Sequence, residues 1–446
     1  MSSGHLSSFL NAIEEARVCM KALNEAQRRL GKRLRCLRRL SQPFVLEEGI
    51  KRLPNEVLAV IFEMAHYLDG EGPVQFALCV SHVSRRFRNV ALATPLLWTT
   101  IHDSFGENQI REFISRSGRL DLNIKMPYST DIECFLKVIK GTSHRWSSLS
   151  IIEQETEYVM MKLGMTDLPR LRYLSYAFPV ELTIFSTPRL SQVVGWGCLF
   201  KSPAGSYLLS NLTHVEFRLY EEDESFKFLA TTLHSMKNLQ DLSFLLEGRT
   251  GEDILLSDNA AYPKPHSVHI DRLAISIVGN MQDYSAPLFD VLIHLRPSTV
   301  ELSINSNAPY RHLLNSKGEF FPYGSTIKFE IPQTIDVTTT LVNLVQNWDI
   351  VRTVHFDTPM AHSLSEWRQN RLHHDDWERI RSLDTLRFMN CDKFSESDIE
   401  AFTTKLFQTE AENGPRSLEI VSCKLISEDF LLGLHDEVGD RLKWTI

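Results

Sequence analysis

Residues 53–65 read Leu-Pro-Asn-Glu-Val-Leu-Ala-Val-Ile-Phe-Glu-Met-Ala, and this stretch decides how the chain is interpreted. Pro54 stands where a helix accepts proline, in the first turn, and Glu56 favours a helix N-terminus through its interaction with the helix dipole. Apolar residues then recur at helical spacing. The stretch therefore predicts an amphipathic helix with an apolar stripe of Val57, Leu58, Ile61, Phe62 and Ala65.

Two shorter helices are expected after this one. Residues 69–73 read Asp-Gly-Glu-Gly-Pro, which predicts a turn, and apolar patterns follow at 76–84 and 86–92. The region 50–99, which ends near Trp98, should therefore form a small three-helix unit. A unit of this size cannot bury all of its apolar side chains, and exposed apolar surface usually marks a partner site. The alternative is that these helices cap the domain that follows.

The order of residues across this region resembles the F-box family. The family pattern is Leu-Pro-x-Glu, an apolar helix ending in Ile-Phe, a Val-Ser-x-x-(Ser/Cys)-(Arg/Lys)-x-(Trp/Phe) segment and a final Leu-Trp. The residues that stand in those places are Leu53, Pro54, Glu56, Ile61, Phe62, Val80, Ser81, Arg86, Phe87, Leu97 and Trp98. Two departures are that Phe87 replaces the commoner tryptophan and that the 69–73 turn is long and rich in glycine.

The resemblance implies a role in protein ubiquitination. Such modules dock onto a Skp-type adaptor, which joins them to a cullin scaffold and its RING subunit. The two departures bear on the strength of that docking more than on the fold. The adaptor-binding residues that the resemblance implies are Leu53, Pro54, Glu56, Val57, Leu58, Ile61, Phe62, Val80, Ser81, Phe87 and Trp98.

A heptad pattern precedes this region. The steps alternate between four and three residues, as in the a/d seam of a coiled coil, and they predict a helix over 6–42 that ends near Pro43. The helix is expected to pair through 9–37 with a partner, with a second copy, or with its own chain. The seam positions are Phe9, Ile13, Ala16, Met20, Leu23, Gln27, Leu30, Leu34 and Leu37.

The second half of the heptad helix is strongly basic. Its cations overlap the heptads, whereas the basic region of DNA-binding zipper proteins precedes the zipper. The net charge of the whole chain is −8, which also argues against a general nucleic-acid binder. Nucleic acid is therefore not an expected partner. The cations are Arg28, Arg29, Lys32, Arg33, Arg35, Arg38 and Arg39.

Residues 100–446 show short alternating apolar runs, each followed by a polar turn and often by a helical pattern. Successive runs start about 20 to 32 residues apart, which brackets the period of leucine-rich repeats. The predicted fold class is an α/β repeat: a coiled-coil helix, a three-helix F-box-like module and an irregular leucine-rich-repeat solenoid with parallel strands on its concave face. The runs lie at 120–124, 149–151, 171–174, 212–217, 239–244, 273–277, 300–304, 327–331, 354–356, 386–388, 418–420 and 442–446.

Two C-terminal repeats share the pattern Cys-x-x-(Phe/Ile)-Ser-Glu-x-x-(Ile/Leu), which resembles the cysteine-containing subclass of leucine-rich repeats. Cys391 and Cys423 are each expected to be buried at the turn after a strand. Helices are expected at 226–236, 288–295 and 341–345. The residues that the resemblance makes structural are Leu386, Phe388, Cys391, Phe394, Leu418, Ile420, Cys423 and Ile426.

Two segments fit the repeats poorly. Residues 190–210 have no clear place in the pattern, and the polar segment 247–269 is expected to protrude. At the end of the chain, Trp444 and Ile446 are expected in a terminal strand or cap.

Catalytic, cofactor and metal sites are not expected. The seven cysteines form no Cys-x-x-Cys pair, and the sequence has no P-loop, no Gly-x-Ser-x-Gly and no His-Glu-x-x-His. Residues 373–376, His-His-Asp-Asp, are the most enzyme-like cluster, with His362 upstream, yet adjacent residues of a helix do not share a face. The chain begins with no signal-peptide pattern and has no apolar run of membrane-spanning length, so the cytosol or nucleus is expected.

These features predict a non-catalytic substrate-recognition subunit of a Skp–cullin–F-box ubiquitin ligase, with domains at 6–42, 50–99 and 100–446. The alternative is a leucine-rich-repeat and coiled-coil scaffold without a ligase link, and an enzyme is the third class. A protein substrate is expected on the concave face, and the order of modules resembles large fungal F-box families. Candidate contact positions are Arg218, Arg272, His355 and Arg387.

Overall fold

The computed structural model divides the chain into two compact units, Met1–Trp98 and Thr99–Ile446, and each is described by itself. No helix among the described residues is long and apolar enough to cross a bilayer. The described residues are 3–68, 76–127, 131–153, 155–178, 182–196, 207–220, 226–248, 269–279, 282–362, 374–407 and 415–445.

The elements of the first unit are all helices or 3-10 turns in the part of it that the structure describes. Its longest element is α1, which runs over Ser3–Arg52, so the helix predicted to stop near Pro43 continues past that residue. A proline removes one backbone hydrogen bond from a helix, and a helix accommodates this loss when the flanking turns stay intact. The shorter helices are α2 (Asn55–Leu68), α3 (Phe76–Val83), α4 (Arg85–Leu92) and the single 3-10 turn η1 (Pro95–Trp98).

The second unit is built on one sheet of 14 strands, all parallel and in sequence order. A separate two-stranded pair joins β11 (Ile335–Asp336) to β13 (Ala361–His362). The strands of the large sheet are β1 (Thr100–His102), β2 (Leu122–Met126), β3 (Trp146–Ile151), β4 (Tyr173–Tyr176), β5 (Gln192–Trp196), β6 (His214–Tyr220), β7 (Asp241–Glu247), β8 (His269–Val278), β9 (Arg296–Asn305), β10 (Thr326–Glu330), β12 (Thr353–Asp357), β14 (Thr385–Met389), β15 (Ser417–Val421) and β16 (Leu442–Thr445).

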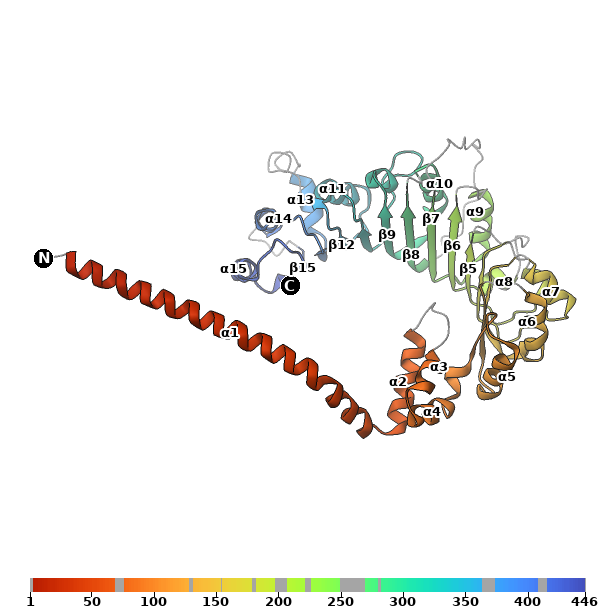
Figure 1. The fold of residues 1–446 in the computed structure, drawn as a ribbon. Coiled ribbons are helices and arrows are strands. Elements are labelled where there is room, and N and C mark those ends of the chain that lie inside the picture. Colours follow the sequence, from red (N-terminus) through yellow and green to blue (C-terminus); the bar gives the residue numbers. More distant parts are fainter. Residues whose placement is uncertain are drawn as a thin grey trace. The chain divides into compact units, whose positions relative to one another are not determined.

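Helices and short turns connect the strands and cover one face of the sheet. Figure 1 shows this sheet curving, with the strands on the inner side and the helices on the outer side. The described connecting helices are α5 (Glu107–Arg116), α6 (Ile132–Ile139), α7 (Thr156–Lys162), α8 (Tyr207–Asn211), α9 (Phe226–Ser235), α10 (Gln282–Leu292), α11 (Val337–Asn347), α13 (His374–Arg381), α14 (Glu396–Phe407) and α15 (Glu428–Val438), with 3-10 turns η2 (Lys140–Arg145), η3 (Leu182–Ile184), η4 (Pro309–Leu313) and η5 (Gly439–Arg441).

The repeats differ in length but keep one register, apart from one shift where β2 pairs with β3. Tyr173 pairs with Gln192, 19 positions later, whereas Thr353 pairs with Thr385, 32 positions later. The extra residues enter the connections and leave the strand ladder unchanged, because each strand contacts only its two neighbours. The predicted order of parallel strands and helices is therefore confirmed.

The core is a set of side-chain columns that run across the sheet. One aromatic column stacks Phe329 on Phe356 at 5.2 Å between ring centroids and Phe356 on Phe388 at 5.9 Å. A neighbouring aliphatic column is buried in every strand, because residues two apart in a strand share a face. It consists of Ile101, Ile124, Leu149, Leu174, Val193, Val215, Leu242, Leu273, Val300, Ile327, Val354, Leu386, Leu418 and Leu442.

Every predicted apolar run overlaps an observed strand, but the sequence pattern missed β1 and β5 of the large sheet and the separate pair of β11 and β13. In β5, Gly195 stands in the column between Tyr176 and Phe217, so the strand lacks its second large buried residue. Of the segment 190–210, residues 197–206 lie outside the described residues, as do 249–268 of the segment predicted to protrude. The terminal strand predicted around Trp444 is β16, and Ile446 lies outside the described residues.

Candidate functional site

Helix α2 has a buried side and an exposed apolar side. Leu58 and Phe62 are only 2% and 4% exposed and belong to the core of the module. The exposed residues are spaced three and four apart, which puts them on one side of a helix. We call this surface the α2 face; it consists of Pro54, Val57 (41% exposed), Val60 (52%), Ile61 (44%) and Met64 (63%).

The buried side of α2 packs on α4 and the turn that follows it. The rings of Phe62 and Phe87 lie 5.1 Å apart between centroids. Ser84 caps α4 by accepting a hydrogen bond from the backbone N–H of Phe87, as serine commonly does at this position. Trp98 is fully buried, and its indole N–H donates to the carbonyl of Ala91 at 2.9 Å. These contacts close the core of the module without covering the α2 face.

Arg86 holds the start of α2 in place. Its guanidinium donates to the carbonyl of Ile50 at 2.9 Å, to that of Leu53, and to Oδ1 of Asn55 at 2.9 Å. The last carbonyls of a helix lack partners within the helix, and a cation stabilises them because it interacts favourably with the helix dipole. Arg86 therefore closes the end of α1 and fixes the loop from which Pro54 projects.

The predicted adaptor-binding residues differ in their exposure. Side chains that are buried inside the module are not available to a partner in this conformation, and five of the predicted contact residues are of this kind. Leu53, Pro54, Glu56, Val57, Ile61 and Phe87 are exposed or half-buried, whereas Leu58, Phe62, Val80, Ser81 and Trp98 are buried.

Sequence reasoning missed Val60 and Met64, which are the two most exposed of the four α2 residues in the α2 face. The predicted stripe joined Val57 and Ile61 to Leu58 and Phe62, although these two pairs lie on different sides of the helix. The spacing of Val57, Val60 or Ile61, and Met64 was a signal for a second apolar side, because successive residues are rotated by about 100°.

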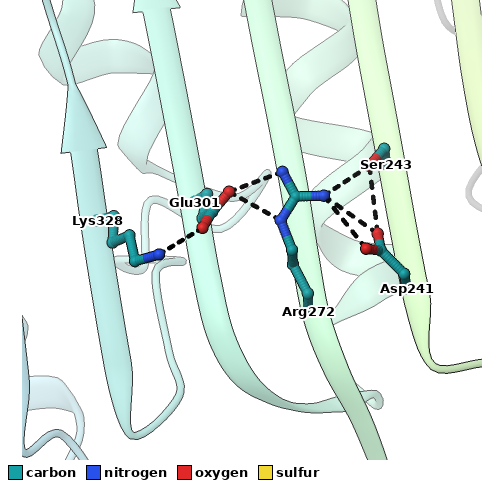
Figure 2. A network of polar contacts seen from close by, with 5 residues as sticks. All are labelled: Asp241, Ser243, Arg272, Glu301 and Lys328. Carbon is teal, nitrogen blue, oxygen red and sulfur yellow. Dashed lines mark hydrogen bonds and ion pairs between the residues drawn. The ribbon is translucent and has the colours of Figure 1, made fainter. Parts of the chain in front are cut away.

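The second candidate surface is the open face of the sheet in the second unit. Figure 2 shows a line of charges that crosses four neighbouring strands. Arg272 donates to Oε2 of Glu301 at 2.8 Å and contacts Asp241 at 3.2 Å, while Lys328 Nζ donates to Oε1 of Glu301 at 2.7 Å. Ser243 accepts a further hydrogen bond from Arg272 at 3.3 Å. The two central charges, Arg272 and Glu301, thus each lie between opposite charges on the adjacent strands.

The electrostatics of this line are set by partial burial and close partners. Partial burial by itself raises the pKa of Glu301, but the hydrogen bonds from Lys328 and Arg272 outweigh it and lower the pKa. Burial lowers the pKa of His355, and the nearby cations Arg387 and Lys328 lower it further. At neutral pH Glu301 is therefore ionised and His355 is uncharged.

A groove of about 520 Å³ lies along this line of charges. Of the predicted contact positions, Arg272 and His355 line it together with Lys328. The other two predicted residues lie on the same face and pair locally: Arg218 with Glu216 at 2.7 Å, and Arg387 with Glu419 at 3.3 Å. The groove thus has a polar wall that can accept hydrogen-bonding and charged groups from a protein segment.

The two cysteine-containing repeats have the same turn. Asn390 and Ser422 both have a φ of 52°, which places the next residue, Cys391 or Cys423, against the strand ends. Both thiols are buried, and hydrogen bonding to Cys423 and burial raise the pKa of Cys391. Cys391 therefore stays protonated and has a packing role. The other residues assigned to these repeats, Leu386, Phe388, Phe394, Leu418, Ile420 and Ile426, are buried.

Within the described part of the chain, no group of three or more His, Cys, Asp or Glu side chains is arranged to hold a metal ion. His373 of the enzyme-like cluster lies outside the described residues. Asp376 of that cluster is buried and accepts a hydrogen bond from Nε2 of Gln346 at 2.6 Å, so it joins α13 to α11. Its contact is structural.

A protein-family model described as F-box-like matches residues 50–104, which contain the α2 face and Arg86. This match confirms the F-box part of the resemblance and covers only that part of the chain. No curated protein matches the sequence.

Proposed function

We propose that the chain is a substrate-recognition subunit of a Skp–cullin–F-box type ubiquitin ligase. In this proposal the α2 face binds a Skp-type adaptor, and the adaptor links the chain to a cullin. The supporting observation is that four apolar side chains, Val57, Val60, Ile61 and Met64, stay exposed on a module whose own core is complete. Apolar surface of this kind gains about 25 cal/mol for each Å² that a partner removes from water.

The adaptor surface extends beyond α2 in this proposal. Leu53 and Glu56 border the α2 face at its start, and Phe87 is half-buried on the neighbouring helix. The F-box-like match at 50–104 supports this location, because adaptor binding is the usual role of such domains. The chain itself then needs no catalytic residue. Its contribution is to raise the effective concentration of a substrate near a ubiquitin-charged enzyme.

The sheet unit is the proposed substrate-binding domain, and we interpret it as an irregular leucine-rich-repeat solenoid. The repeat lengths run from 19 to 32 residues, a range that includes the repeat length of about 20–29 residues in that family. The groove beside Arg272, Lys328 and His355 is the proposed contact region for a protein substrate. The cytosol or nucleus is the proposed location. A scaffold without a ligase link would share this domain but would not bind the adaptor.

Adaptor binding tests the proposal directly. Full-length protein titrated with a Skp-type adaptor should show micromolar or tighter affinity by calorimetry. The double variant Val57→Glu, Ile61→Glu should weaken it by about 30-fold or more, because charges would enter the apolar centre of the interface. The matched control is Leu432→Glu, which changes an apolar residue of α15 that is 50% exposed in the sheet unit.

The control should bind as the unchanged protein does, and circular dichroism should show that all variants fold. Absence of binding by the unchanged protein at micromolar concentration would remove the ligase assignment. If the double variant bound the adaptor as tightly as the unchanged protein does, the adaptor site would lie elsewhere than on the α2 face.

A further inference from the structure

Helix α1 carries an apolar seam without a partner among the described residues. We define the α1 seam as Met20, Leu23, Gln27, Leu30, Leu34 and Leu37, the a and d positions of three successive heptads. Its apolar members are each more than half exposed: Met20, Leu23, Leu30, Leu34 and Leu37. An apolar row of this length on a single helix usually marks a contact surface.

The charges beside the seam exclude a second copy as the natural occupant. The flanking e and g positions between residues 10 and 40 hold no carboxylate, and their only charged residues are Arg17, Arg33 and Arg38. In a parallel pair, a g residue faces the e residue five positions later on the partner helix, so Arg33 would face Arg38 of the other copy. In an antiparallel pair, e faces e and g faces g, which again offers no acidic partner.

The remaining cations strengthen this argument. Residues 28–39 contain seven Arg or Lys and no Asp or Glu, and all seven side chains are exposed. Lys32, Arg33 and Arg38 have no ion pair within the described part of the chain. A parallel pair of copies would bring two such segments together, and like charges at neighbouring helix positions are destabilising.

We propose that the α1 seam binds an amphipathic helix of a different protein, with Glu or Asp at the positions that face Arg33 and Arg38. The apolar seam selects a helix, because nucleic acid would leave these leucines uncovered. The cations select an acidic helix and reject a second copy of this chain. This surface is separate from the α2 face, and the proposal stands independently of adaptor binding.

The probe for the test is a synthetic four-heptad peptide with Ile at a, Leu at d and Glu at every e and g position. The full-length protein should bind this peptide in a fluorescence anisotropy titration at physiological salt. It should bind the matching peptide with Lys at every e and g position at least about tenfold more weakly. Sedimentation of the protein alone at the same concentration should show a monomer.

Charge-reversed variants make the test specific. Arg33→Glu with Arg38→Glu should weaken binding of the Glu peptide about tenfold or more and favour the Lys peptide. The matched control, Arg35→Glu with Arg39→Glu, changes the net charge equally at positions away from the seam and should retain the preference for the Glu peptide. Leu30→Ser with Leu34→Ser should abolish binding of both peptides.

Three results would overturn the proposal. The first is a stable dimer of the unchanged protein that the leucine variant dissociates. The second is equal weakening of Glu-peptide binding by the two charge-reversed variants. The third is binding of a DNA duplex as tight as that of the Glu peptide and insensitive to the leucine substitutions.

Discussion

At the scale of single residues, Arg86 connects the motif to the fold that presents it. The sequence identified Arg86 only as a position of the family pattern. The structure gives this residue a physical role, because its planar guanidinium reaches acceptors at the end of α1 and at the start of α2 together. Pattern matching identifies such a residue, but the carbonyl groups that it binds have no signature in the sequence.

Removal of this guanidinium should loosen the N-terminal module. Arg86→Ala is expected to lower the free energy of unfolding by about 1–2 kcal/mol, since the site is partly exposed and its hydrogen bonds are charge-assisted. Arg86→Lys should recover only part of this loss, because one ammonium cannot reach all the acceptors. Urea denaturation followed by circular dichroism measures both variants, and full recovery by lysine would contradict the assigned role.

Truncation of adjacent residues of α2 should destabilise the protein to different extents. Phe62→Ala is expected to lower the free energy of unfolding by about 3–5 kcal/mol, because it leaves a cavity beside Phe87. Ile61→Ala should cost less than about 1 kcal/mol, because Ile61 is 44% exposed and its removal leaves no enclosed cavity. The same denaturation experiment compares the two, and similar losses would mean that α2 is rotated relative to the described packing.

At the scale of elements, the strands were predictable because each carries its own alternation of buried and open residues. Strand β5 escaped prediction because Gly195 interrupts this alternation, and the ladder to its neighbours maintains the strand. Helix α2 was predicted as an element, but not its orientation. Both of its sides are apolar, so periodicity alone does not identify which side faces the core.

One buried histidine should make the sheet unit sensitive to acid. His312 in η4 is fully buried between Ser285 and Ser306, whose hydroxyls lie 3.1 and 3.0 Å from its ring nitrogens. Burial lowers its pKa below the ordinary value of about 6.5. The unfolded state therefore binds a proton at higher pH than the folded state. Stability should be constant above about pH 6.5 and fall as the pH decreases toward the lowered pKa.

The variant His312→Gln isolates this contribution. The loss of unfolding free energy between pH 7.5 and pH 5.5 should be smaller in the variant than in the unchanged protein. Urea denaturation at the two pH values measures the difference. An identical pH dependence in both proteins would show that His312 is accessible to protons in the folded state.

At the scale of the whole molecule, the order of modules followed from local patterns: heptads, then the Leu-Pro-x-Glu motif, then alternating strands. Contacts between residues that are distant in the sequence could not be predicted from local patterns. The charge line of Asp241, Arg272, Glu301 and Lys328 joins residues that lie 27 to 31 positions apart. Their proximity depends on the register of four parallel strands, which is set by the buried columns. The groove beside these residues therefore could not be predicted from the sequence, although the sequence did predict that a substrate binds on this face of the sheet.

The account depends on α2 being the surface through which the chain joins a larger assembly. Hydrogen–deuterium exchange of the full-length protein, with and without saturating Skp-type adaptor, measures this directly. The account predicts that amides of residues 55–68 exchange at least about tenfold more slowly in the complex, while exchange in the sheet unit is unchanged. Unchanged exchange in α2 at saturation, or protection confined to the sheet unit, would contradict it.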